Sequence, residues 1–345
     1  MIFNGGREKM KQIARALLVA AAALAVPPQA YAQQTFEMKL ATATVKDPNE
    51  AWLHEFGSRI EAKTSGRIKA RVFPAGQLGS IERVIEGMQL GTIEFSNIPP
   101  AFLVGLNPAF QVSEAPGVFE SARQAQRVFT DERLRARFLG AADDKGITGT
   151  SFWIYGTNVY ATVRPVRSLE GFKGMKIGVR ASKVESDLMA QLGASGVPIT
   201  FTEVLPALQS RVIDGYRGAL VVLYGRQFHG VTKYVTLLDD SYIPIVGWVS
   251  KAFLAKLPPD LRATLLATAQ EMDAYGFDIA TKAGAISEKL WTEAGGEVIR
   301  LSPAERAEAL RRVSSVSTQN LSQHSHRETR ELFGLMREIA AATKN

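Results

Sequence analysis

The chain has 345 residues, of which 46% are hydrophobic and 22% charged, proportions that indicate a folded globular protein and exclude a disordered or collagen-like chain. Its 41 Lys and Arg against 34 Asp and Glu give a formal charge of +7, but the basic residues are spread out, which argues against nucleic-acid binding. Cysteine is absent, which excludes disulfide bonds, cysteine-ligated metal centres and cysteine nucleophiles. The length predicts two domains.

Residues 1–32 have the three parts of a secretory signal peptide. Basic residues precede an apolar run of eleven residues, Ala16 to Val26, and an A-x-A cleavage pattern closes the segment. The apolar run is too short to span a bilayer, which needs about 20 residues. We therefore expect the mature protein to begin at Gln33 in the periplasm, with a formal charge reduced from +7 to +4. Met1 and Met10 are alternative starts.

The first half of the mature chain predicts a βαβαβ unit. Asp47 has the chemistry of a helix N-cap, with a proline directly after it and an acidic residue three positions on. Gly91 is placed as the C-terminal cap of a second helix. We expect strands over 36–43, 68–72 and 93–98 and helices over 48–65 and 81–90. This alternation implies a mainly parallel sheet covered by helices.

The second half predicts another α/β unit and then a long helix. We expect strands over 175–179, 197–201 and 243–249 and helices over 182–192 and 202–213. From Pro258 to Ala294 a helical pattern runs for more than 30 residues, far beyond the mean helix of about 11–12. A helix of that length in a two-lobed protein is expected to bridge both lobes. A further helix is expected to begin after Ser302, which opens a capping box.

The sequence contains no local catalytic signature. There is no G-x-S-x-G, P-loop or G-x-G-x-x-G motif, and no metal-ligand spacing among the four histidines. The adjacent acids at 143–144 and 239–240 are expected to be solvated turn residues. The sequence therefore predicts neither an enzyme nor a resident cofactor or metal.

Four ordered motifs nevertheless resemble those of the DctP-type solute-binding proteins of TRAP transporters. The segment Ser168–Arg180 is similar to the family's "dLkGlKiRv", and Pro198–Gly215 to "P..f.Evy.ALq.G.vDG". Upstream, Phe73–Gly79 matches "yP.gqLG" and Gly91–Phe95 matches "G.id".

The resemblance implies a two-lobed periplasmic-binding-protein fold of the α/β class, with a hinge and a long helix that bridges both lobes. A small ligand would be enclosed between the lobes and delivered to a sodium-driven TRAP permease with a small and a large subunit. We expect lobe I to comprise residues 33–155 and 244–283, and lobe II residues 156–243 and 284–345. Ligands of α/β sheets lie beyond the carboxyl ends of the strands, and two such edges across a hinge make a closable cleft.

The chain departs from the family at the arginines that usually bind the ligand's carboxylate. Gly178 stands where the family has the arginine of "KiR", and Asn158 follows Gly156-Thr157 where a second arginine is common. Strand side chains alternate, so Arg180 would lie on the same face as Gly178, about 6.6 Å away. We expect Arg180 to take over the carboxylate, or else to be a surface or hinge residue.

Other residues near the expected cleft complete the predicted site. Aromatic side chains could wall in a ligand with an apolar body, or could equally be core or inter-lobe packing. The expected ligand-binding residues are Arg180, Asn158, Trp153, Tyr155, Phe201, Arg217, Gly218, Asn97 and Tyr242. The predicted function is a periplasmic receptor for an organic acid. The alternatives are a ligand-sensing receptor for a signalling partner and a receptor for a neutral or cationic solute.

Overall fold

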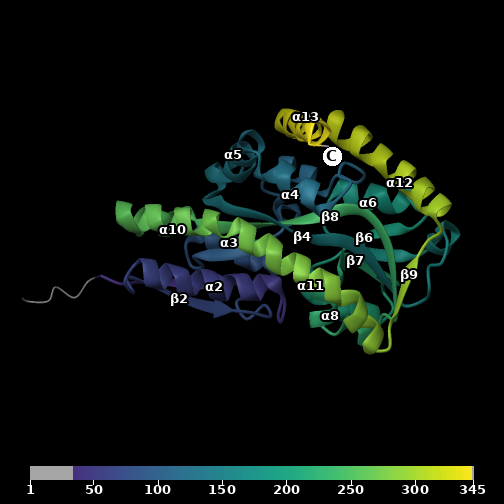
Figure 1. The fold of residues 1–345 in the computed structure, drawn as a ribbon, viewed down its shortest axis with the longest axis horizontal. Helices are drawn as coiled ribbons and strands as arrows, with labels where there is room; N and C mark the ends of the chain where they lie inside the picture. The colour runs from purple at the N-terminus through teal and green to yellow at the C-terminus, as the bar shows by residue number, and fades with distance from the viewer. Residues whose placement is uncertain (1–33, 344–345) are drawn as a thin grey trace, which may run out of the picture. The chain divides into compact units, whose positions relative to one another are not determined.

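The computed structural model describes residues 34–343, and the chain from Phe36 onward forms one compact unit. The predicted signal peptide and its cleavage site lie outside the described residues. Strands and helices alternate along the unit, which confirms the α/β class (Figure 1). The strands are β1 (Phe36–Ala41), β2 (Ile68–Phe73), β3 (Phe95–Ile98), β4 (Ile147–Thr162), β5 (Lys176–Val179), β6 (Ser195–Pro198), β7 (Gly215–Ala219), β8 (Tyr234–Ser250) and β9 (Glu297–Arg300). The helices are α2 (Pro48–Lys63), α3 (Ile81–Leu90), α4 (Ala122–Thr130), α5 (Glu132–Gly140), α6 (Lys183–Gln191), α7 (Val204–Gln209), α8 (Leu220–Gly225), α9 (Lys251–Lys256), α10 (Pro259–Glu271), α11 (Asp273–Glu293), α12 (Pro303–Ser317) and α13 (Arg327–Ala342).

The strands of the described residues form one nine-stranded sheet. Its order is β2-β1-β3-β8-β4-β7-β5-β6, and β9 also pairs with β8. β1 pairs in parallel with β2 and β3 at one end, and β5 pairs in parallel with β6 and β7 at the other. The long strands β4 and β8 run antiparallel between these ends and join them. The two predicted α/β units are therefore present, while the exact lobe boundaries stay a prediction.

The length of β8 was not predicted from the sequence. The apolar pattern indicates a strand only over 243–249, whereas β8 begins at Tyr234. Asp239, with φ of 53°, and Pro244 interrupt the pattern and suggest a loop. The pairing of β8 with β4 shifts register near Gly156, so the strands tolerate both residues at irregular positions. Most of β8 is buried, which removes the alternation by which strands are recognised.

The predicted helix ends are confirmed at three places. The Asp47 side chain accepts from the Glu50 amide at 3.0 Å and caps α2, and Ser302 caps α12 in the same way through Glu305. Gly91 ends α3 in the left-handed conformation with φ of 74°. A Cβ atom at Gly91 would also lie 2.8 Å from the Cβ of Ala252, so only glycine fits.

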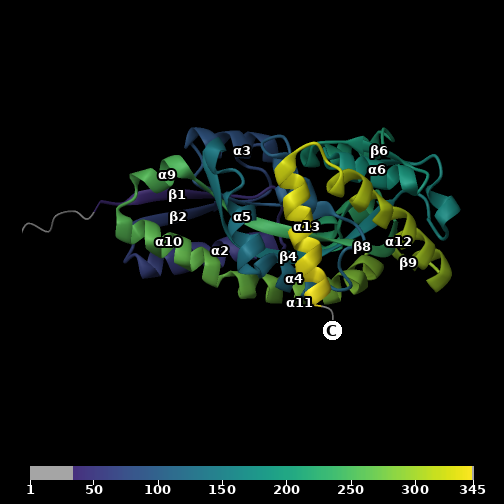
Figure 2. The same cartoon turned by 90° about the horizontal axis from the view of Figure 1, so that it is seen from above.

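The predicted long helix is two helices. α10 ends and α11 begins at Met272, whose ψ of −3° interrupts the α-helical conformation. Met272 is fully buried and its carbonyl accepts from the Trp52 indole at 3.1 Å, which anchors the junction to α2. α11 packs against β4, α2 and α8, so this pair of helices runs along much of the sheet (Figure 1). On another side, α13 packs against α4 and α5 (Figure 2).

One predicted strand is misplaced. The sequence predicts a strand over 197–201, whereas β6 covers Ser195–Pro198 and Phe201 opens a short 3-10 helix. Pro198 has no amide hydrogen with which to continue a ladder, so the strand ends there. The displacement changes the setting of Phe201, which lies in a turn beyond the strand end.

Candidate ligand-binding cleft

A cleft lies between the two ends of the sheet. Its empty space is about 680 Å³, which includes the part that opens to solvent. The end of β1, β3 and helices α2 and α3 contribute one wall, while β7, α8 and the segment after β5 contribute the other. The polar lining residues are Thr42, Thr44, Asn49, Ser96, Asn97 and Arg180. Most of the remaining wall is aliphatic or aromatic, so the cleft suits a ligand with an apolar body.

Five of the predicted site residues line this cleft: Asn97, Tyr155, Arg180, Phe201 and Gly218. The Phe201 ring lies 6.1 Å from that of Tyr216, another lining residue, so the two form an aromatic wall. The hydroxyl of Tyr155, another lining residue, donates to Asp47 at 2.5 Å, which fixes the position of its ring.

The other four predicted residues lie outside the cleft. Asn158 and Tyr242 line a small adjoining hollow together with Arg180. Trp153 is fully buried against α11, where a Cβ on Gly276 would lie 2.6 Å from the indole. Arg217 is also fully buried, because it lies between Tyr216 and Gly218 on β7 and strand side chains alternate between faces. The cleft is on the face of its two neighbours.

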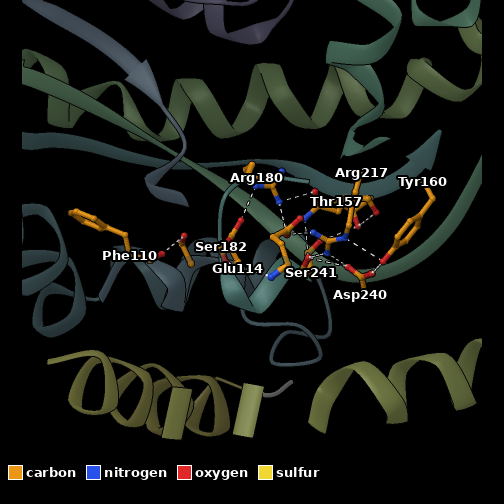
Figure 3. A network of polar contacts seen from close by, with 12 residues as sticks. Phe110, Glu114, Thr157, Tyr160, Arg180, Ser182, Arg217, Asp240 and Ser241 are labelled. Atoms are coloured by element: carbon orange, nitrogen blue, oxygen red, sulfur yellow. Dashed lines mark hydrogen bonds and ion pairs between the residues drawn. The ribbon is translucent and has the colours of Figure 1, made fainter. Parts of the chain in front are cut away.

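Arg180 is held by acidic side chains as well as by its place in the wall. β5 ends at Val179, so Arg180 lies just beyond the strand rather than within it. Its Nε donates to Glu114 at 2.7 Å, and its Nη2 donates to Glu185 at 2.7 Å and to the side-chain Oδ1 of Asn158 at 3.4 Å (Figure 3). These partners pre-orient the guanidinium and partly neutralise it.

Arg217 continues the same buried network (Figure 3). It donates to the carboxylates of Glu185 and Asp240 and to the Ser241 hydroxyl at 2.6 Å. Its Nε donates to the Tyr160 hydroxyl at 3.2 Å, and that hydroxyl donates to Asp240. The expectation that Asp240 is a solvated turn residue is therefore wrong, because Asp240 is 2% exposed and pairs with a distant arginine. Adjacency in sequence cannot reveal such a pairing.

The network contains three carboxyl groups and two arginines. Burial, with a smaller contribution from the nearby charge of Glu185, raises the pKa of Glu114 to about 7, although Arg180 opposes the shift. Burial also raises the pKa of the Tyr216 hydroxyl to about 12. The Glu114 carboxyl can therefore gain or lose a proton near neutral pH.

Two lining asparagines have buried polar atoms without a hydrogen-bond partner among the described residues. Both Oδ1 and Nδ2 of Asn97 are unpaired, and so is Oδ1 of Asn49. Asn97 is 2% exposed and Asn49 is 4% exposed. Buried polar groups are nearly always hydrogen-bonded, so these atoms indicate contacts that a ligand would complete.

Sequence reasoning missed three residues for identifiable reasons. Asn49 belongs to the pattern that starts α2, and Glu185 stands three residues after the N-cap Ser182, where an acid normally serves the helix end. Instead Glu185 reaches both arginines. Glu114 ends a 3-10 helix, Pro108–Glu114, for which the sequence gives no periodic signal.

The described residues contain no cluster of His, Cys, Asp or Glu that could hold a metal ion. In the same part of the chain, no helix combines the length and apolar character needed to cross a membrane. The cleft between two sheet ends, with its apolar walls, defines the class: a two-lobed solute-binding protein.

Comparison with known proteins identifies the family. Residues 41–323 match the model of DctP, the bacterial extracellular solute-binding protein family 7, and the chain belongs to this family. Since the family consists of transport receptors, the chain is a solute-binding receptor and not an enzyme.

Individual relatives agree with this assignment. The 2,3-diketo-L-gulonate-binding periplasmic protein YiaO of Escherichia coli is 25% identical over 77% of this chain and 81% of its own length. A solute-binding protein of Roseobacter denitrificans is 30% identical over the same shares. A TRAP periplasmic solute-binding protein of Pseudomonas putida F1, solved with bound D-glucuronate, is 26% identical with a TM-score of 0.81 over 90% of this chain and 98% of that one. The predicted two-lobed fold is thereby confirmed.

Proposed function

We propose that this chain is an exported receptor that encloses a small carboxylate in the cleft and delivers it to a TRAP permease. Arg180 carries the proposal, because it is the one charged side chain among the described residues that line the cleft. A guanidinium in an otherwise uncharged cavity is suited to a carboxylate, with which it forms paired hydrogen bonds. The ligands named for the relatives from E. coli and P. putida are also organic acids.

The charge of the network limits the ligand to one carboxylate. Glu114 and Glu185 already contact Arg180, and a ligand carboxylate must share the guanidinium with them. Protonation of Glu114 removes one of these competing charges, and its raised pKa of about 7 makes that protonation accessible near neutral pH. A second ligand carboxylate would have no cation in the cleft.

A thermal-shift screen of carboxylates, amines and polyols tests the ligand class. We expect a carboxylate to raise the melting temperature, and Arg180→Ala to weaken its binding by about 2–5 kcal/mol, as for loss of one partner of a buried charge pair. Arg180→Lys should also lose affinity, because an ammonium cannot reproduce the planar fork. Arg311→Ala, on the exposed face of α12, is the control. Unchanged affinity in Arg180→Ala would instead favour a neutral or cationic solute.

Export and delivery need separate tests. Amino-terminal sequencing of protein from the periplasmic fraction should begin at Gln33. Uptake of the bound acid by cells should disappear when the receptor is deleted. Intact uptake without the receptor would favour the alternative role, in which the receptor presents its ligand to a signalling partner.

A further inference from the structure

The cleft wall that includes β3 contains an unpaired amide. Asn97 lies on β3, where its backbone pairs with Gly247 of β8. Its side chain makes no hydrogen bond within the described residues, although both polar atoms are buried. Such an amide costs free energy in the ligand-free protein unless another molecule satisfies it.

The neighbours of Asn97 are already engaged or lack donors. The Ser96 hydroxyl donates to the Ala41 carbonyl at 2.8 Å, and the hydroxyls of Thr42 and Thr44 pair with each other at 3.0 Å. Pro99 follows β3 and has no amide hydrogen. The Asn97 amide and the unpaired Oδ1 of Asn49 are therefore available to form hydrogen bonds with a ligand in the cleft.

We propose that Asn97 and Asn49 form a subsite that reads an uncharged, amide-like group of the ligand. An amide side chain offers one acceptor and one donor side by side, and its complement is a group with the same pair, such as a carboxamide or lactam. This inference rests on the proposed function, in which Arg180 takes the ligand's carboxylate. It specifies the substrate class as a monocarboxylate that also carries an amide-like group and an apolar body.

The charges around the subsite exclude a second carboxylate there. Its polar neighbours Thr42, Thr44 and Ser96 are uncharged. Asp47, which accepts from the lining residue Tyr155 and precedes Asn49 by two positions, would repel an anion. A buried carboxylate without a cation is strongly disfavoured. A polyhydroxylated body is disfavoured as well, since most of the wall offers its hydroxyls no partner.

Matched ligands test this class by titration calorimetry at pH 7. The aliphatic set is succinamate, succinate and butyrate; the aromatic set is 4-carbamoylbenzoate, terephthalate and 4-methylbenzoate. Succinamate and 4-carbamoylbenzoate are the half-amides of the two sets. In at least one set we expect the half-amide to bind about tenfold or more tightly than both the dicarboxylate and the methyl analogue of that set, as for a site built to hydrogen-bond its substrate. D-Glucuronate is included as a sugar acid.

Two variants separate recognition from folding. Asn97→Leu should abolish the preference for the half-amide without lowering the melting temperature, because no hydrogen bond within the protein is lost. Gln124→Leu is the matched control: that buried amide donates to the Ala340 carbonyl at 3.0 Å and accepts from the Glu120 amide at 2.7 Å, away from the cleft. It should lower the melting temperature and keep the preference.

Several results would overturn the subsite. The first is that a dicarboxylate or D-glucuronate binds as tightly as the half-amide, or more tightly. The second is that the preference for the half-amide persists in Asn97→Leu. The third is that Asn97→Leu lowers the melting temperature as Gln124→Leu does. If succinate or D-glucuronate binds best, the subsite fails while the proposed receptor function stands. If no probe binds at 10 mM, the substrate class is wrong, and a negative result in the wider carboxylate screen would then remove the proposed function too.

Discussion

Replacing Arg217 by methionine tests whether the buried network stabilises the fold. Methionine has similar length and no charge, so the change leaves Glu185 and Asp240 without this cation. Removing one partner of a buried ion pair costs about 3–5 kcal/mol. Glu185 keeps its bond to Arg180, and Asp240 keeps the Tyr160 hydroxyl, so we expect the lower part of that range, about 3–4 kcal/mol.

This loss should be visible in a thermal melt followed by circular dichroism. For a chain of this size about 2 °C is lost per kcal/mol, so the melting temperature should fall by about 6–8 °C. Arg311→Met, which breaks an exposed pair with Glu308, should change stability by less than about 0.5 kcal/mol. Adding Asp240→Asn to Arg217→Met should restore part of the loss, because the orphaned charge disappears. If Arg217→Met melted within 1 °C of the wild type, the network would not stabilise the fold as described.

Three further predictions concern the pH dependence of stability, the steric overlap of a side chain at position 178, and the closure of the two lobes. The pKa of Glu114 lies at about 7 in the folded protein against an ordinary 4.5, so the folded state holds the extra proton and its stability falls as pH rises between these values. Glu114→Gln should remove up to about 3 kcal/mol of this decline in denaturant titrations. If the free energy of unfolding fell with pH equally in the wild type and in Glu114→Gln, Glu114 would not be the group responsible. Gly178→Arg should destabilise the protein by about 1–3 kcal/mol in the same titrations, because a Cβ there would lie 2.9 Å from Ile213 and 3.1 Å from Tyr216; an unchanged midpoint would show that the space is free. A saturating ligand should reduce the radius of gyration in X-ray scattering if the lobes close about a hinge, and identical scattering would argue against closure.

The sequence predicts the ends of individual helices well, but it does not predict how the two α/β units join into one sheet. Helix caps at Asp47, Gly91 and Ser302 are signalled by the residues themselves, because capping is a local interaction. The single sheet depends on β4 and β8, whose pairing links residues from 72 (Thr162 and Tyr234) to 103 (Ile147 and Ser250) positions apart. The hydrophobic pattern within β4 or β8 does not indicate that the two strands pair with each other.

The site residues, too, could be placed from the sequence only where a local pattern identifies the strand or helix that carries them. Tyr216 and Gly218 line the cleft while Arg217 between them does not, a distinction that follows from strand alternation. The sequence did not predict β7, so that rule could not be applied to Arg217. Asn97 could be placed because it lies near the end of a recognised strand, whereas the partners of Arg180 come from a 3-10 helix and from inside α6.

The space at Gly178 explains why this chain cannot use the family's usual arginine. The ring of Tyr216 and the side chains of Ile199 and Ile213 fill the volume into which a side chain at 178 would project. Tyr216 also lines the cleft, so a side chain at 178 would have to displace part of the aromatic wall. Arg180 supplies the cation from beyond the end of β5, and Glu114 and Glu185 hold it there. Under the proposed function, this places the positive charge beside two acids, Glu114 and Glu185, and we therefore predict a ligand with one carboxylate and an apolar body rather than a dicarboxylate.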